Sequence, residues 1–134
     1  MKRLSVDTLE NKIKRILEAN QIEKDFKQRI VLCEDGNHLV IELSNIVRLE
    51  SVGNYTTFYL SDGRSIISSK TLRKYDDQLP ESCFFRIFRS HIINMNFVTS
   101  FAISVKSTVT MSDGKILELS RSKKKKFFEL MEKF

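Results

Sequence analysis

The sequence predicts a mainly β domain of antiparallel hairpins, flanked by a helix at each end. Each of the four glycines lies beside an aspartate or asparagine, between runs of apolar residues. Such pairs tolerate the positive φ of tight hairpin turns, so each glycine is expected to mark one. A length of 134 residues suits one domain with a single core.

The first 27 residues are expected to form a linker rather than part of the β domain. Ser5 or Asp7 would cap a helix over residues 5–20, in which Leu9, Ile13 and Ile16 recur at helical spacing. This apolar face would pack against the domain or against a second copy of the chain, or the helix would join an upstream unit. The domain itself is expected to span residues 28–134.

Within the domain, alternation of apolar and polar residues predicts strands, and two segments depart from that period. Residues 69–78 are expected to form a short helix that ends before Pro80, with Leu72 and Tyr75 facing inward. The chain is expected to close with a helix from about Ser122, whose apolar face carries Phe127 and Leu130. The expected strands cover residues 30–33, 38–43, 46–50, 55–60, 64–68, 97–103, 107–111 and 115–119.

Composition excludes several classes of protein. Charged residues make up 30% of the chain, and no apolar run approaches the length of a membrane span or a signal peptide, so a cytoplasmic protein is expected. Cys33 and Cys83 have no metal-ligand spacing and are expected to be small buried hydrophobes. The phosphate-binding, dinucleotide-binding and hydrolase motifs are missing, and neither His38 nor His91 has a companion ligand. We therefore expect no enzyme activity, cofactor or metal.

Positive charge is concentrated near the C-terminus, within a net charge of +6. Residues 121–126 place five cations in six positions. Cations in the first turn of a helix oppose its macrodipole, which favours an anionic partner for the cluster over a merely solvated helix face.

A second basic segment covers residues 84–94. Alternation is expected to bury Phe84 or Phe85 together with Phe88, and to turn Arg86 and Arg89 outward. His91 and Asn94 would extend the polar surface. The arginines would then either face an anionic partner or pair with acidic neighbours of the same domain.

Together with Asn54 and Tyr55, these segments predict nucleic-acid binding, because arginines bind guanine edges and lysines neutralise phosphates. The candidates lie on three separate stretches, at residues 54–55, 86–91 and 120–124. The alternative, a β-rich protein-interaction module with an incidental basic tail, would not explain polar and cationic candidates on three distant segments.

Four stretches resemble the LytTR family of DNA-binding domains, the effector modules of many bacterial response regulators. They are the strand and turn of residues 45–55, the short helix of 71–80, the phenylalanine–arginine signature of 85–94 and the closing hairpin with its serine–arginine stretch at 113–124. Phe88 stands where the family usually has a histidine. The resemblance implies an elongated β-β-β sandwich whose loops enter successive major grooves of double-stranded promoter DNA.

The resemblance also implies roles for individual residues. Asn54 or Tyr55 would enter one groove, Arg89 with Ser90 or His91 would contact the backbone between the grooves, and Ser120, Arg121, Lys123 and Lys124 would serve the other groove. Arg86 and Asn94 are expected to be mainly structural.

The family further implies partners. Its members bind paired repeats, so a homodimer on tandem sites is expected. Most members carry an upstream receiver domain of a two-component system, for which 134 residues leave no room. The chain would be either a stand-alone regulator or the effector half of a longer one.

Overall fold

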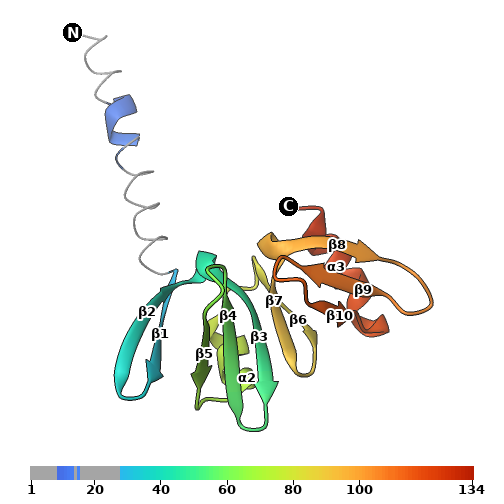
Figure 1. Cartoon of the computed structure of the whole chain (residues 1–134). Coiled ribbons are helices and arrows are strands. Elements are labelled where there is room, and N and C mark those ends of the chain that lie inside the picture. Colours follow the sequence, from blue (N-terminus) through green and yellow to red (C-terminus); the bar gives the residue numbers. More distant parts are fainter. Residues whose placement is uncertain (1–8, 14, 16–27) are drawn as a thin grey trace.

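The computed structural model describes residues 9–13, 15 and 28–134, in which three antiparallel sheets dominate (Figure 1). The strands are β1 (Arg29–Glu34), β2 (Asn37–Glu42), β3 (Ile46–Val52), β4 (Tyr55–Leu60), β5 (Ser65–Ser68), β6 (Phe84–Phe88), β7 (His91–Asn94), β8 (Val98–Ala102), β9 (Thr108–Met111) and β10 (Ile116–Glu118). The helices are α2 (Leu72–Gln78) and α3 (Lys124–Met131), with short 3-10 turns η1 (Leu43–Asn45), η2 (Met95–Phe97) and η3 (Arg121–Lys123). The mainly β class is confirmed. Most of the helix expected over residues 5–20 lies outside the described residues, although 9–13 are helical.

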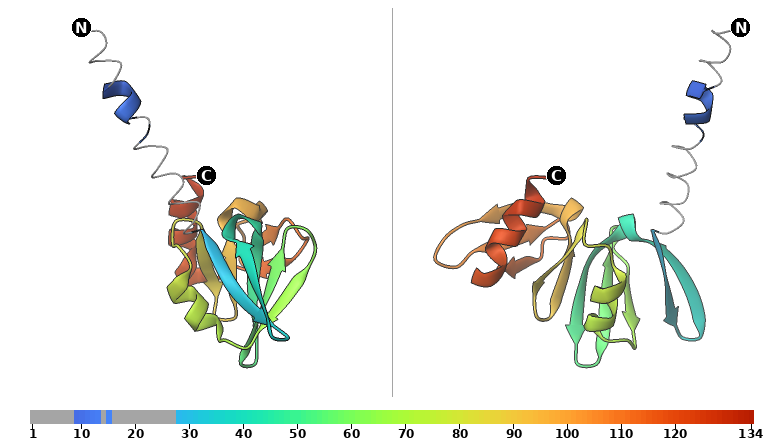
Figure 2. Two further views of the ribbon diagram at one scale, coloured as in Figure 1. Left: turned by 90° about the vertical axis from the view of Figure 1, so that its left-hand side faces the viewer. Right: turned by 180° about the vertical axis from the view of Figure 1, so that it is seen from behind.

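The three sheets are arranged side by side, which makes the molecule elongated (Figures 1 and 2). A central five-stranded sheet, with strand order β5-β4-β3-β7-β6, lies between the β1–β2 hairpin and the three-stranded sheet β10-β9-β8. Every pair of neighbouring strands is antiparallel. None of the described helices is long and apolar enough to cross a bilayer.

The central sheet is apolar on both faces, and this produces two cores rather than the expected single one. Successive side chains of a strand point to opposite faces. Ile46 of β3 therefore packs in the core shared with β1–β2, whereas its neighbour Val47 packs in the core shared with β8–β10. The consecutive pairs Phe84–Phe85 of β6 and Ile92–Ile93 of β7 divide between the two cores in the same way.

Each core is completed by one helix. In α2, Leu72 and Tyr75 are buried as expected, and the Tyr75 ring meets Phe58 edge to face at 4.7 Å between centroids. In α3, Phe127 is fully buried, and its ring lies 5.3 Å from that of Phe101 on β8. The C-terminal helix is therefore an integral part of the third layer.

Three residues expected in the core are not buried there. Phe88 is 41% exposed, because the pairing of β6 with β7 shifts register between Arg86 and Phe88 and the strand ends at the tip of the hairpin. Cys33 is exposed on the outward face of the β1–β2 ribbon, which has only one face against the core. Cys83 is half-buried just before β6.

The hairpin turns follow the glycines, as expected. Gly53 joins β3 to β4 with a φ of +61°, and Gly114 joins β9 to β10 with a φ of +86°. Both values lie in the left-handed region, where a side chain would strain the backbone. The two turns are consequently tight, and each fixes the position of the residues beside it.

Candidate nucleic-acid interface

The three basic or polar segments lie on one long side of the molecule, although they come from different sheets. The β3–β4 turn carries Asn54, Tyr55 begins β4 directly after it, and the β6–β7 turn carries Arg89 and Ser90. Both turns are at the lower end of the central sheet in Figure 1, and the start of α3 lies farther right on the same lower side. The reverse view in Figure 2 gives the same arrangement.

The first two turns are neighbours because β3 pairs with β7. Glu50 lies opposite His91 in this ladder, and one residue later the amide of Ser51 donates to the carbonyl of Ser90 at 2.8 Å. The Ser51 hydroxyl also donates to the carbonyl of Gly53 at 3.4 Å. These bonds hold the β3–β4 tip in a fixed position beside the β6–β7 turn.

Arg86 organises the β6–β7 turn from within. Its Nη2 donates to the carbonyl of Arg89 at 2.7 Å, and its Nη1 lies 3.4 Å from a carboxylate oxygen of Asp76 on α2. Arg89 is exposed at the tip. Arg86 is therefore occupied by its own domain, whereas the Arg89 side chain faces solvent.

Asn94, at the other end of β7, is almost completely buried. Its Nδ2 donates to the carbonyl of Ile46 at 2.9 Å, and its Oδ1 accepts from the amide of Asn96 at 3.0 Å. These bonds connect β7 to β3 and cap η2. The sequence pattern that placed Asn94 on the polar surface was wrong, because the central sheet is covered on both faces.

His91 lies half-buried between β3 and the third sheet. Burial lowers the pKa of its imidazole; the carboxylate of Glu50 opposes this effect, and the charges of Arg48 and Lys115 add to it. Its Nδ1 is buried without a hydrogen-bond partner among the described residues. Burial thus favours the neutral form of the imidazole.

Arg48 connects the central sheet to the third sheet, a role that sequence patterns did not reveal. Its guanidinium donates from Nε to Oδ2 of Asp113 at 2.7 Å and lies 3.7 Å from the centroid of the Tyr59 ring. Nη1 also forms an ion pair with Glu50 at 3.5 Å. The only signal in the sequence was an arginine within the otherwise apolar run of residues 46–49.

The third segment is the junction between β10 and α3. Arg121 and Lys124 begin η3 and α3, and no side chain caps either helix. The first turn of α3 contains no acidic residue. Lys123 lies 5.8 Å from the centroid of the Phe85 ring, which anchors this junction against the central sheet. Ser120 is half-buried and Arg121 is exposed.

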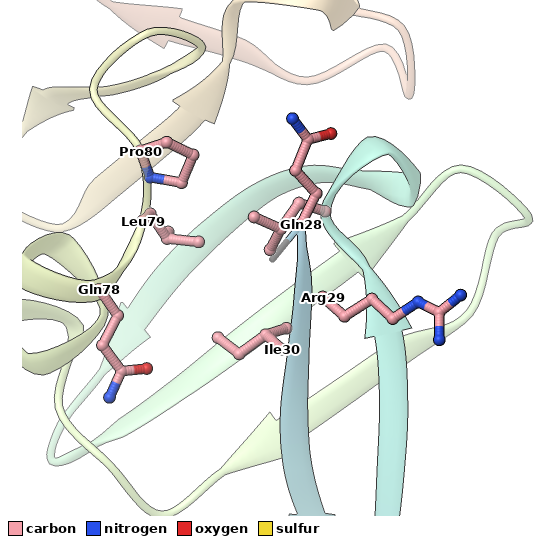
Figure 3. Close-up of a pocket in the computed structure, with 7 residues that line it drawn as sticks. Gln28, Arg29, Ile30, Gln78, Leu79 and Pro80 are labelled. Carbon is pink, nitrogen blue, oxygen red and sulfur yellow. The ribbon is translucent and has the colours of Figure 1, made fainter. Parts of the chain in front are cut away.

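The pocket of about 320 Å³ between β1 and the end of α2 is of a different kind (Figure 3). Ile30, Leu43, Leu79 and Pro80 line it, with the amides of Gln28 and Gln78 at its rim, and the Arg29 side chain points away from it. The described residues include no cluster of three or more metal-ligating side chains. None of the residues that line this pocket belongs to the β3–β4 turn, the β6–β7 turn or the β10–α3 junction.

A comparison with protein families relates this arrangement to known proteins. The profile of the LytTr DNA-binding domain matches residues 36–132. The chain belongs to this family. This LytTr domain also resembles a solved structure, the LytTr DNA-binding domain of a methyl-accepting/DNA response regulator from Bacillus cereus. The two have a TM-score of 0.66 at 20% identity, over 78% of this chain and 96% of the other.

Two curated relatives are transcriptional regulators. The transcriptional regulatory protein NatR of Bacillus subtilis is 28% identical over 112 residues, which make up 84% of this chain and 47% of NatR. The heme-containing CO-sensing transcriptional regulator RcoM 2 of Paraburkholderia xenovorans is 28% identical over 96 residues, 69% of this chain and 36% of RcoM 2. The chain thus spans less than half the length of these relatives. The family and these relatives identify it as a DNA-binding domain of the kind found in transcriptional regulators.

Proposed function

We propose that this LytTr domain binds specific sequences in double-stranded promoter DNA through its three turn segments. The β3–β4 tip would occupy one major groove, the β10–α3 junction would occupy the next, and Arg89 with Ser90 would contact the backbone between them. The observation that carries the proposal is that the two turns and the start of α3 lie on one side of three sheets that pack as layers around two cores. These segments carry the exposed Asn54, Arg89 and Arg121.

The start of α3 supports this proposal electrostatically. Four consecutive lysines occupy residues 123–126, where the helix dipole is positive and no acidic residue compensates. A DNA phosphate near this end would interact favourably with the lysines and with the free amides of the helix. Arg121 precedes them at a fixed corner, a suitable position for a bidentate contact with guanine.

Arg121 and the lysines are expected to contribute differently. Arg121→Ala should cost roughly 1 to 3 kcal/mol of binding free energy on the specific site and little on unrelated DNA. Lys124→Ala or Lys125→Ala should weaken both complexes alike and lower the salt slope by about one unit for each lost phosphate contact. Arg64→Ala, at an exposed position of the β4–β5 turn at the opposite end of β4 from the β3–β4 tip, is the matched control and should change neither.

The experiment is a mobility-shift titration of the chain with a promoter duplex, in the presence of unrelated competitor and at several salt concentrations. Retention of the specific complex against excess competitor would support sequence-specific binding, and equal competition by all duplexes would refute it. Equal losses for Arg121→Ala on both duplexes would make Arg121 a phosphate contact. Two shifted species on a duplex with tandem repeats, and one on a single repeat, would support binding as a pair.

A further inference from the structure

The β3–β4 tip differs chemically from the other glycine turns of the described chain. Asp35, Asp62 and Asp113 precede the glycines of the three other hairpins. In the β3–β4 turn, Val52 precedes Gly53 and Asn54 follows it. A carboxylate would be repelled by DNA phosphates, whereas this tip carries no negative charge.

The tip also exposes apolar surface at its end. Val52 and Tyr55 are partners in the register of β3 with β4, so their side chains lie on the same face of the hairpin. They are 59% and 55% exposed. Between them Asn54 is exposed, and its amide has no hydrogen-bond partner among the described residues. The tip thus presents one free amide beside the apolar side chain of Val52 and the ring of Tyr55.

The tip is rigid enough to position these groups. Ser51 donates from its hydroxyl to the carbonyl of Gly53 and from its amide to that of Ser90. Two residues after Asn54, in β4, Thr56 is fully buried, and its hydroxyl donates to the carbonyl of Lys70 at 2.8 Å. The hairpin end is therefore fixed to the β6–β7 turn on one side and to the start of α2 on the other.

From this chemistry we infer that the β3–β4 tip recognises an A·T step in the major groove. A two-stranded ribbon fits that groove, and an asparagine amide matches the N6 donor and N7 acceptor of adenine. An apolar side chain matches the C5-methyl of thymine. Asn54 contacts adenine, and Val52 contacts the methyl group of a thymine in the same step. This inference rests on the proposed function and adds the class of base pair and the role of Val52.

Base analogues that remove one recognised group at a time test the inference. A specific duplex is first selected from random sequences with the wild-type chain. Each adenine of that duplex is then replaced singly by 7-deaza-adenine, which lacks the N7 acceptor, and each thymine by uracil, which lacks the methyl group. Affinities for these duplexes are measured with wild type, Asn54→Ala and Val52→Ala.

We expect one adenine at which the 7-deaza analogue weakens wild-type binding roughly 5- to 150-fold, the range of a bidentate base contact. Asn54→Ala should lose that sensitivity and keep the sensitivity to uracil. At a neighbouring thymine, uracil should weaken wild-type binding about fourfold, the worth of one buried methyl group. Val52→Ala should lose this second sensitivity and keep the first.

The β1–β2 hairpin supplies matched controls. Asn37 follows Gly36 just as Asn54 follows Gly53, and Val40 is an equally exposed valine at 60%. Asn37→Ala and Val40→Ala should retain both analogue sensitivities, and circular dichroism of all four variants should match wild type.

The outcomes separate the inference from the proposed function. If wild type selects no duplex, the proposed function fails and the inference fails with it. If wild type selects a site but the Asn54 and Val52 variants keep the full analogue penalties, the inference alone is overturned. It is also overturned if no A·T pair of the selected site is sensitive to the analogues.

Discussion

Arg48 and Asp113 are 65 positions apart in the sequence, yet Nε of Arg48 donates to Oδ2 of Asp113 at 2.7 Å. Arg48 is 6% exposed on β3, and Asp113 belongs to the turn between β9 and β10. This bond joins the central sheet, which carries the β3–β4 tip, to the sheet that leads into Arg121. It therefore contributes to the spacing between the two segments proposed to enter successive grooves.

Removing this contact should destabilise the domain. Asp113→Asn leaves the buried guanidinium with Glu50 and the Tyr59 ring, so we expect a loss of about 1 to 3 kcal/mol in the free energy of unfolding. Glu118→Gln, which breaks the exposed pair of Lys106 and Glu118 at 4.0 Å, should cost less than about 1 kcal/mol. Urea denaturation of both variants measures the difference. Equal costs would show that the Arg48–Asp113 bond contributes no more than a surface pair.

The environment of His91 predicts a dependence of stability on pH. Burial lowers its pKa in the folded chain, so the unfolded chain binds the proton more readily. The contribution of His91 should therefore be fully present above the unfolded pKa of about 6.5 and decline as pH falls toward the lower folded pKa. Thermal unfolding of wild type and His91→Gln between about pH 5 and 8 should show a smaller decline in the variant. An unchanged decline in His91→Gln would contradict the prediction.

The packing of α3 predicts that the position of the basic residues 121–126 depends on the core formed by α3 and the third sheet. Phe127 is fully buried among Phe85, Phe101 and Phe128. Phe127→Ala should cost about 3 to 5 kcal/mol of unfolding free energy, through lost burial and the cavity left behind. Phe134→Ala, at an exposed position near the C-terminus, should change stability by less than about 0.5 kcal/mol. A small effect of Phe127→Ala would mean that α3 is only loosely attached to the sheet.

The described part of the N-terminal helix predicts self-association. Leu9 and Ile13 lie one helical turn apart and are 59% and 50% exposed, so much of each side chain is open to a partner. We expect them to bury against a second copy; Ile16, expected on the same face, lies outside the described residues. Replacing both with glutamate should weaken self-association in sedimentation experiments, whereas Asn11→Glu should not.

Deleting residues 1–20 tests the proposed domain boundary. The two cores draw their buried residues from position 30 onward, so the shortened chain should keep the circular dichroism and unfolding midpoint of the β domain. Unfolding of the shortened chain would instead make the N-terminal segment part of the core.

Local patterns in the sequence predicted the hairpins, the buried faces of the helices and the cationic segments of this protein. Glycines beside aspartate or asparagine fixed the hairpins, because tight turns need a positive φ that depends on only one or two residues. Helical spacing placed Leu72, Tyr75 and Phe127 toward the interior, where the structure has them. The cationic segments and the resemblance to the LytTR family followed from residues near one another in the chain.

The tertiary structure decided what depends on distant residues. The sequence predicted one core, but consecutive apolar residues such as Ile46 and Val47 serve two, because sheets cover both faces of β3. Alternation of apolar and polar residues predicted that Phe88 is buried, whereas the register shift near the end of β6 leaves it exposed. The Ser51–Ser90 bond and the Arg48–Asp113 pair required strands from separate stretches to align. Such contacts arise from packing and strand register, which spacing along the chain does not encode locally.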